Sequence, residues 1–517
     1  MIRSFVTVLS GTLASRLLGF VRDALIAALL GAGPAADAFL AAFQLINVVR
    51  RLLTEGALNA ALVPAWLRIY QQAGTIRARA FAGRVLGTVS AGLLAATIVL
   101  AILMPIALTV LMPGFAGEQT LTWAIDDARL MLPYLAFAGP STVLLALSSA
   151  QRRFALAAFA PLLFNIALIG VTIVLLAQHP DPGHGALLLA ATIGIAGLLQ
   201  LTALALGGRA TASPVRISLG PEMRGFFAKA LPGMVASAGP QLLAVAGAII
   251  ASGSPSAVSW LYFANRLIEL PLGLVGVAMG TVLVPEMTRA LPDGNKHALA
   301  EVQSHGLELT IGLALPATLG LMILSEPVVR LLFEHGAFMS EDAAATAQVL
   351  TWLALALPAQ VLTKALQPAF FAREDTQTPL RATLIGCGAA IASAFLLGRS
   401  FGASGIAAGL ALGASANAAI LIWRGAAGFG FSILPATRRR LPRIALATVV
   451  MGAVLWSAAA TTMGVSSGHK LGAAVLLLAL IGGAMMLYAL MLSALDVISW
   501  RETVRTFRRA PPRDLHL

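Results

Sequence analysis

Charged side chains interrupt the first apolar segment of this chain. The stretch SRLLGFVRDALIAALLG, residues 15–31, contains Arg16, Arg22 and Asp23 in a run that is otherwise long enough to cross a lipid bilayer. At 100° per residue, Arg16 and Asp23 share one helix face within about 20°, whereas Arg22 points about 120° away from Arg16. We therefore expect Arg16 to pair with Asp23, Arg22 to be freer to meet an anionic ligand, and Gly19 to let the helix bend.

A second apolar segment carries a continuous polar stripe. On a helix, the polar residues of this segment fall within an arc of about 120°, and they are Asp37, Gln44, Asn47, Arg51, Glu55 and Asn59. A single polar residue would be ordinary glue between membrane helices, but six aligned residues require a water-filled cavity. Arg50 lies outside the stripe if the helix is straight.

The segment SWLYFANRLIELPLGLVG, residues 259–276, repeats this arrangement. Its polar residues Tyr262, Asn265, Arg266 and Glu269 have the spacing of one helix face. Two interpretations are open. Either Arg266 and Glu269 neutralise each other, or arginines from all three segments line one cavity.

Arginines that converge inside a membrane predict an anion site. Each arginine at the centre of a spanning helix costs about 2.5–3.5 kcal/mol on insertion scales, so it needs water, a counter-ion or a ligand. The planar guanidinium fork matches phosphate oxygens, which favours a phosphate or diphosphate over a cation or a sugar. The carboxylates expected to hold the arginines in place are Asp23, Asp37, Glu55 and Glu269.

The elements that carry these residues are membrane helices. The chain has 517 residues, of which 58% are hydrophobic, and a mean hydropathy of +0.87, too apolar for a soluble globule. Its apolar runs do not alternate like barrel strands and predict an all-α polytopic membrane protein. We expect 14 transmembrane helices, at about residues 5–31, 37–66, 82–111, 128–149, 157–177, 186–207, 227–251, 257–285, 300–324, 345–370, 380–398, 404–423, 443–463 and 470–495.

A faint internal repeat divides these helices into two halves. The pattern V-P-x-x-x-R occurs at Val63–Arg68 and again at Val284–Arg289, each time at the end of a long polar-bearing segment. Transporters are often built from such repeats, with the binding site between them. We therefore expect two pseudo-symmetric six-helix lobes plus two C-terminal helices and a basic tail, at residues 1–210, 211–430, 431–500 and 501–517.

The net charge of +13 reflects membrane topology rather than nucleic-acid binding, because most basic residues lie in short loops between apolar runs. With a cytoplasmic N-terminus, the cytoplasmic segments hold 25 basic residues and the outer loops only Arg330, Arg399 and Lys470. The positive-inside rule therefore predicts a multi-pass protein with both termini in the cytoplasm.

Other polar residues are not expected to form a binding site. Arg129 follows Asp126 and Asp127, and we expect it to be their local salt-bridge partner. The histidines lack the spacing of metal ligands, no G-K-S/T sequence is present, and Cys387 is the single cysteine. We therefore expect no metal, no cofactor, no P-loop and no disulfide.

The polar segments resemble a known family. SRLLGFVRD, DAFLAAF, NVVRRLLTEGALNAALVP and YFANRLIELPLGLVGVAMGTVLVP are similar to the signature segments of the MurJ (MviN) lipid II flippases. These flippases belong to the multidrug/oligosaccharidyl-lipid/polysaccharide exporter superfamily. The resemblance is strongest in the first, second and eighth expected helices.

The resemblance implies a transporter rather than an enzyme. A cationic central cavity would accept lipid II, an undecaprenyl-diphosphate-linked disaccharide-pentapeptide, at the inner leaflet of the bacterial cytoplasmic membrane. It would release lipid II at the outer leaflet by alternating access, for peptidoglycan synthesis, cell wall biogenesis and cell shape. The implied partners are lipid II, membrane lipids and, transiently, cell-wall synthesis proteins, and the last two helices would form a groove for the lipid tail.

The family's functional positions carry over residue by residue. Its essential arginines match Arg16, Arg22, Arg50 and Arg266. Its acidic positions match Asp37, Glu55 and Glu269. The family thus favours Arg50 where the straight helix favours Arg51, and many relatives have a proline where this chain has Ile46. Gln44 and Asn265 replace a basic and an acidic residue of the family, which leaves the cavity positive.

Three alternatives and one question stay open. The chain could export another polyprenyl-diphosphate-linked oligosaccharide, or be a small-molecule antiporter of the same superfamily. A membrane-embedded transferase would require clustered Asp or His in its loops, and these loops are short and mainly basic. The seventh and eleventh expected helices contain no Asp, Glu or Asn for a sodium site, and membrane potential, protons and sodium all stay open as the driving force.

Overall fold

The computed structural model is all-helical in its regular structure. It describes residues 2–54, 57–151, 153–207, 212–236, 239–278, 296–371, 373, 375–429, 434–462 and 470–497, and no strand occurs among them. Helices dominate because a helix satisfies its own backbone hydrogen bonds, which an apolar chain in lipid must do. The prediction of an all-α polytopic membrane protein is confirmed.

The chain divides into two compact units. The first comprises Met1–Arg266, Leu332–Thr346 and Ala390–Leu410, and the second comprises the remaining segments Leu267–Leu331, Ala347–Ala389 and Ala411–Leu517.

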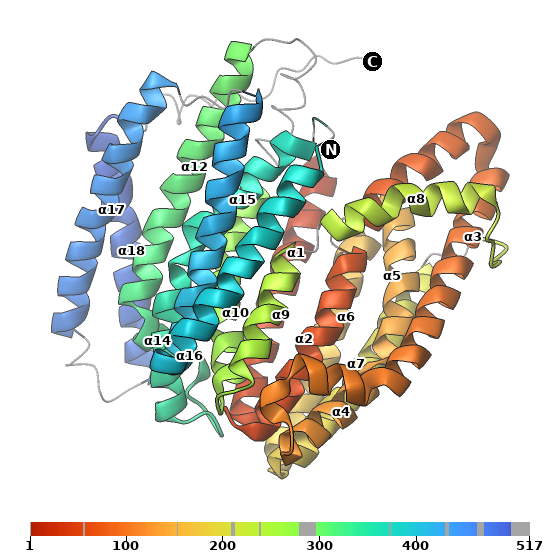
Figure 1. Cartoon of the computed structure of the whole chain (residues 1–517), viewed down its shortest axis with the longest axis horizontal. Helices are drawn as coiled ribbons and strands as arrows, with labels where there is room; N and C mark the ends of the chain where they lie inside the picture. Colours follow the sequence, from red (N-terminus) through yellow and green to blue (C-terminus); the bar gives the residue numbers. More distant parts are fainter. Residues whose placement is uncertain are drawn as a thin grey trace. The chain divides into compact units, whose positions relative to one another are not determined.

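The first unit contains the helices of the N-terminal half. Within it, α1 packs against α6, α3 against α5, and α2 against α4 (Figure 1). Its helices are α1 (Ile2–Leu30), α2 (Pro34–Thr54), α3 (Ala57–Leu111), α4 (Gln119–Met131), α5 (Pro133–Ala150), α6 (Phe154–Gln178), α7 (Pro182–Gly207), α8 (Pro221–Ala236), α9 (Gly239–Ala251) and the start of α10 (Ala257–Ala278).

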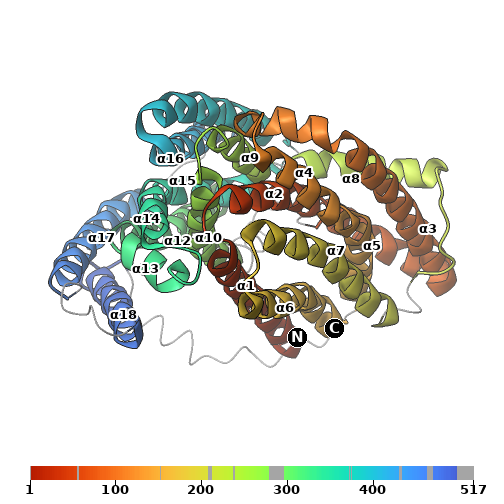
Figure 2. The same cartoon turned by 90° about the horizontal axis from the view of Figure 1, so that it is seen from below.

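The second unit is held together by α12, which packs against α15 and α17, while α17 packs against α18 (Figure 2). Glu308 of α12 joins two residues of α17, since it accepts hydrogen bonds from Thr437 at 2.5 Å and from Arg440 at 3.1 Å. The later helices of the chain are α12 (Lys296–Ile323), α13 (Ser325–Phe333), α14 (Ser340–Ala354), α15 (Ala356–Phe371), α16 (Gln377–Phe429), α17 (Pro435–Thr462) and α18 (Lys470–Ala494).

Two long helices are broken by glycines. Gly74 in α3 has φ 76° and ψ 178°, and Gly402 in α16 has φ 57° and ψ −139°. These conformations are essentially restricted to glycine. Each glycine therefore separates two helical arms, and the breaks fall in the gaps expected at 66–82 and 398–404.

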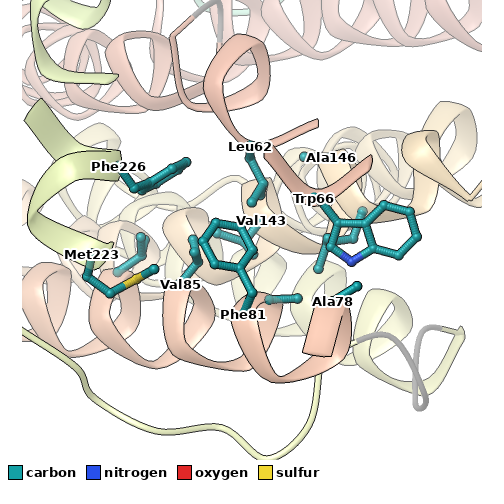
Figure 3. Close-up of a cluster of buried hydrophobic side chains, with 12 residues drawn as sticks. Leu62, Trp66, Ala78, Phe81, Val85, Val143, Ala146, Met223 and Phe226 are labelled. Carbon is teal, nitrogen blue, oxygen red and sulfur yellow. The ribbon is translucent and has the colours of Figure 1, made fainter. Parts of the chain in front are cut away.

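A buried apolar cluster joins the arms of α3 to neighbouring helices of the same unit. Trp66 and Phe81 lie on either side of the break in α3, and Phe226 of α8 packs edge-on against Phe81 with ring centroids 5.8 Å apart (Figure 3). α8 and α9 run in different directions (Figure 1). The span expected at 227–251 is therefore divided between two helices.

Eight helices of the described residues are long and apolar enough to cross a membrane, or nine if the bent pair Ser340–Ala354 and Ala356–Gln367 is one span. The counted helices include α3 and α16 as single elements, although a glycine divides each of them. The expected number of 14 transmembrane helices stays a prediction.

Candidate functional site

The centre of the site is the carboxylate of Asp23 on α1, which is fully buried. Arg22 donates to its Oδ1 from Nε at 2.9 Å and from Nη2 at 2.6 Å. Arg266 of α10 places its Nε 2.6 Å from Oδ2, in an ion pair that is not aligned as a hydrogen bond. Tyr262, one turn earlier on α10, donates to Oδ1 at 3.4 Å. Two guanidinium groups from different helices thus converge on one carboxylate, and the three groups carry a formal charge of +1.

Arg22 is also held from α6. Its Nη1 donates to Oδ1 of Asn165 at 3.0 Å, and Nδ2 of Asn165 donates to the backbone carbonyl of Ser15 at 3.2 Å. The guanidinium carbon lies 5.2 Å from the ring centroid of Phe43 and 5.9 Å from that of Phe164, within cation–π range. Arg22 is therefore clamped between α1, α2 and α6, with only 7% of its surface exposed.

Gly19 makes room for the guanidinium group of Arg266. A Cβ atom at this position would lie 2.6 Å from Nη2 of Arg266, closer than atoms in contact approach each other. α1 is one uninterrupted helix from Ile2 to Leu30. The missing side chain of Gly19 is therefore used for packing, and a bend of the helix at Gly19 stays a prediction.

Two predictions about Arg16 and Arg22 are wrong. Arg16 is exposed and makes no ion pair with Asp23 or any other residue within the part of the chain that the structure describes. Arg22, expected to be freer, is the buried partner of Asp23. A helical wheel compares only the directions of positions on one helix. The flexible side chain of Arg22 nevertheless reaches the carboxylate of the next residue, Asp23. The other contacts come from Asn165 on α6 and Arg266 on α10, which the wheel does not include.

Arg50 is held on α2 by a residue one turn earlier. Its Nε donates to Oδ1 of Asn47 at 3.0 Å, and both residues are half-buried. The buried hydroxyl of Tyr134 on α5 is within electrostatic range of both Arg50 and Arg22. Arg51 is half-buried as well. The orientation of Arg50 and of Arg51 toward a cavity therefore stays a prediction.

Asp37 positions the helix that carries Arg266. Its Oδ1 accepts hydrogen bonds from the backbone N–H of Ser259 at 2.9 Å and from the Ser259 hydroxyl at 2.5 Å. Ser259 lies in the first turn of α10, where backbone N–H groups lack helical partners, so Asp37 acts as a helix cap supplied by α2. Asp37 thus supports the cluster from a distance, through α10.

The other predicted site residues are Asn265, Glu269 and Glu55. Asn265 and Glu269 are half-buried on α10, where Glu269 belongs to the second unit, and Glu55 lies outside the described residues. Among the described residues, no group of three His, Cys, Asp or Glu side chains is arranged to hold a metal ion.

Sequence reasoning missed Asn165 and Ser259. Asn165 is an isolated polar residue in the apolar segment FALAAFAPLLFNIALIGVTIVLLAQ, which is the signal that could have identified it. Ser259 has no such signal, since serine is common at the start of a helix.

The fold has solved counterparts. A lipid II flippase MurJ, solved in an inward closed conformation, superimposes with a TM-score of 0.78 at 20% identity, over 98% of this chain and 100% of that one. A MATE family multidrug resistance transporter of the MOP superfamily, in an inward-facing conformation, gives a TM-score of 0.66 at 16% identity, over 83% and 95% of the two chains. Fold and site together define a multi-pass helical membrane protein with the MurJ and MATE architecture.

Sequence comparison identifies the family. The family model for lipid II flippase MurJ matches residues 26–497. A probable lipid II flippase MurJ of Rhizobium meliloti is 38% identical over 467 residues, which cover 89% of this chain and 86% of the relative. The lipid II flippase MurJ of Burkholderia cenocepacia is 31% identical, covering 81% and 82%. This chain belongs to the MurJ family.

Proposed function

We propose that this protein moves lipid II from the inner to the outer leaflet of the bacterial cytoplasmic membrane. The observation that carries the proposal is the convergence of Arg22 and Arg266 on the single carboxylate of Asp23. A buried cluster with formal charge +1 suits a diphosphate, and the curated relatives carry the name lipid II flippase.

The arginines have different roles in the proposed site, according to how exposed their side chains are. Arg22 is enclosed by Asp23, Asn165 and two aromatic rings, so it forms the base of the site. The Arg266 side chain is 20% exposed and Arg16 is exposed. Arg266 and Arg16 are therefore the arginines that contact the diphosphate, and Arg22 and Asp23 hold Arg266 in place.

The proposed lobes, lipid-tail groove and membrane topology follow from the sequence pattern and from membership of the MurJ family. Residues 1–210 and 211–430 act as two six-helix lobes that alternate access to a cationic cavity, and residues 431–500 receive the lipid tail. Both termini lie in the cytoplasm, as the distribution of basic residues favours. Cell-wall synthesis proteins contact the transporter transiently.

A second candidate is export of another polyprenyl-diphosphate-linked oligosaccharide, because the arginine cluster recognises the diphosphate and not the sugar. An antiporter of organic cations is disfavoured, since a cluster with formal charge +1 would repel its substrate.

The test is translocation of labelled lipid II in proteoliposomes. Arg266→Ala removes a charge-assisted contact worth about 1.5–3 kcal/mol, so transport should fall at least tenfold. Arg399→Ala is the matched control, because Arg399 is an exposed arginine stacked on Phe395 outside the cluster. Arg266→Lys keeps the charge and loses the guanidinium fork. Wild-type transport by Arg266→Ala would overturn the assignment of the site, and preference for another diphosphate-linked oligosaccharide would establish the second candidate.

A further inference from the structure

A second fully buried carboxyl group, Asp127 of α4, differs from those of the site. Asp23 and Asp37 are buried to a similar degree, but each accepts a hydrogen bond from α10, Asp23 from Tyr262 and Asp37 from Ser259. Both carboxyl oxygens of Asp127 are buried, and neither has a hydrogen-bond partner among the described residues. The function proposed above gives this group no role.

The expected salt bridge to Asp127 is not formed. Arg129 is exposed, and its Nε donates to the backbone carbonyl of Ala101 at 3.3 Å. The neighbouring Asp126 is exposed and bears a like charge that acts on the Asp127 carboxyl. Two positions along a helix separate side chains by about 200°, so Arg129 points away from Asp127.

Among the described residues, no basic side chain of the helices packed against α4 forms an ion pair or a hydrogen bond with this carboxyl. α4 packs against α2, α7, α3 and α5 (Figure 2). Within the described ranges, the charged group that acts on the Asp127 carboxyl is Asp126, and its charge is negative. The titratable and charged residues of the packed helices are Asp37, Arg50 and Arg51 on α2, His184 on α7, Arg68, Tyr70, Arg77, Arg79 and Arg84 on α3, and Tyr134 on α5.

An ionised carboxylate cannot remain in this position. Transfer of an unpaired carboxylate into an apolar interior is so unfavourable that the group takes up a proton instead. We propose that Asp127 is a proton-binding site, which holds a proton while α4 is packed against α2 and α7 and releases it when water reaches the carboxyl.

This proposal rests on the proposed lipid II transport in one respect. If α4 opens toward opposite sides of the membrane in the two halves of the transport cycle, then Asp127 binds a proton from one side and releases it to the other, and each cycle carries one proton across the membrane. A pH gradient then drives transport, which selects protons among the driving forces that the sequence left open. A one-unit gradient corresponds to 1.36 kcal/mol, or about a tenfold shift in the distribution of lipid II.

The coupling is tested in proteoliposomes with the membrane potential clamped. The wild type should shift labelled lipid II about tenfold per pH unit, in opposite directions for the two polarities of the gradient. Asp127→Asn should translocate lipid II without this response. Asp126→Asn, the matched control on the adjacent exposed residue, should keep it. A wild type that ignores the gradient, or an Asp127→Asn variant that still responds, would overturn the coupling.

Proton binding itself is tested without lipid II. At neutral pH, the infrared spectrum of the purified wild type should contain the C=O stretch of a buried protonated carboxyl group. Asp127→Asn and Asp127→Val should lose this band, and Asp126→Asn should retain it. Two isosteric variants are tested, so that the result still stands if one of them fails to fold. If the band is absent from the wild type, the proton site is wrong even when lipid II is transported, and if it is present without transport, only the proposed function fails.

Discussion

Replacement of Gly19 by alanine tests whether close approach of Arg266 to α1 is required for transport. The new Cβ would lie 2.6 Å from Nη2 of Arg266, so the guanidinium must withdraw by about 0.8 Å to reach the 3.4 Å at which ordinary contact begins. If Nε moves equally, the 2.6 Å ion pair to Asp23 weakens by about 1.5 kcal/mol at an effective dielectric constant of 20. This corresponds to about a tenfold loss of transport.

Folding stability provides the contrast for this variant. Alanine is favoured over glycine inside a helix by about 0.5–1 kcal/mol, which offsets part of the weakened ion pair. We therefore expect a Tm close to that of the wild type, together with reduced lipid II translocation in proteoliposomes. Gly170→Ala on α6 is the control, since no atom lies within 4 Å of its added Cβ. Unchanged translocation by Gly19→Ala would refute the reasoning that Arg266 must lie against α1.

Three further substitutions separate support of the site from general stability. Asn165→Ala removes a charge-assisted hydrogen bond to Arg22 worth about 1.5–3 kcal/mol, so both Tm and translocation should fall, and an unchanged Tm would contradict the clamp. Asp37→Ala removes the cap of α10 at a cost of about 0.5–2 kcal/mol, and Asp37→Asn should recover part of the Tm. Glu308→Ala breaks the contact with Arg440 and should lower Tm while the folded protein keeps its translocation rate; a selective loss of transport would assign Glu308 to the cycle instead.

The helices could be predicted from the sequence because each apolar run must satisfy its own backbone in lipid. The first expected span, 5–31, corresponds to α1 at Ile2–Leu30, and the breaks near Gly74 and Gly402 lie where polar residues and glycine interrupt the apolar pattern. The division of 227–251 into α8 and α9 was missed, although Gly239 and Pro240 stand at the start of α9 and a Gly-Pro pair is a signal for a break in a helix.

The types of residue in the site were predictable, but their partners were not. Intramembrane charge singled out Arg22, Asp23 and Arg266, whereas the wheel of one helix cannot include Asn165, which is 143 positions away on α6. The same limitation explains Asp127, where proximity in sequence suggested a salt bridge to Arg129 that the helix geometry prevents. Pairing depends on which helices meet, and that information is distributed over the whole chain.

The shared carboxylate also constrains how this family can evolve. Loss of Asp23 alone would leave one buried cation, Arg22, and one half-buried cation, Arg266, without their shared carboxylate, and loss of Arg22 alone would leave Asp23 and Arg266 as a neutral pair. Removal of one member of a buried ion pair costs about 3–5 kcal/mol, because the other charge is left uncompensated. Replacement of all members together by well-packed apolar residues is often neutral. The three positions are therefore epistatic: loss of Arg22 leaves a compensated pair, whereas loss of Asp23 requires compensating changes at the arginines.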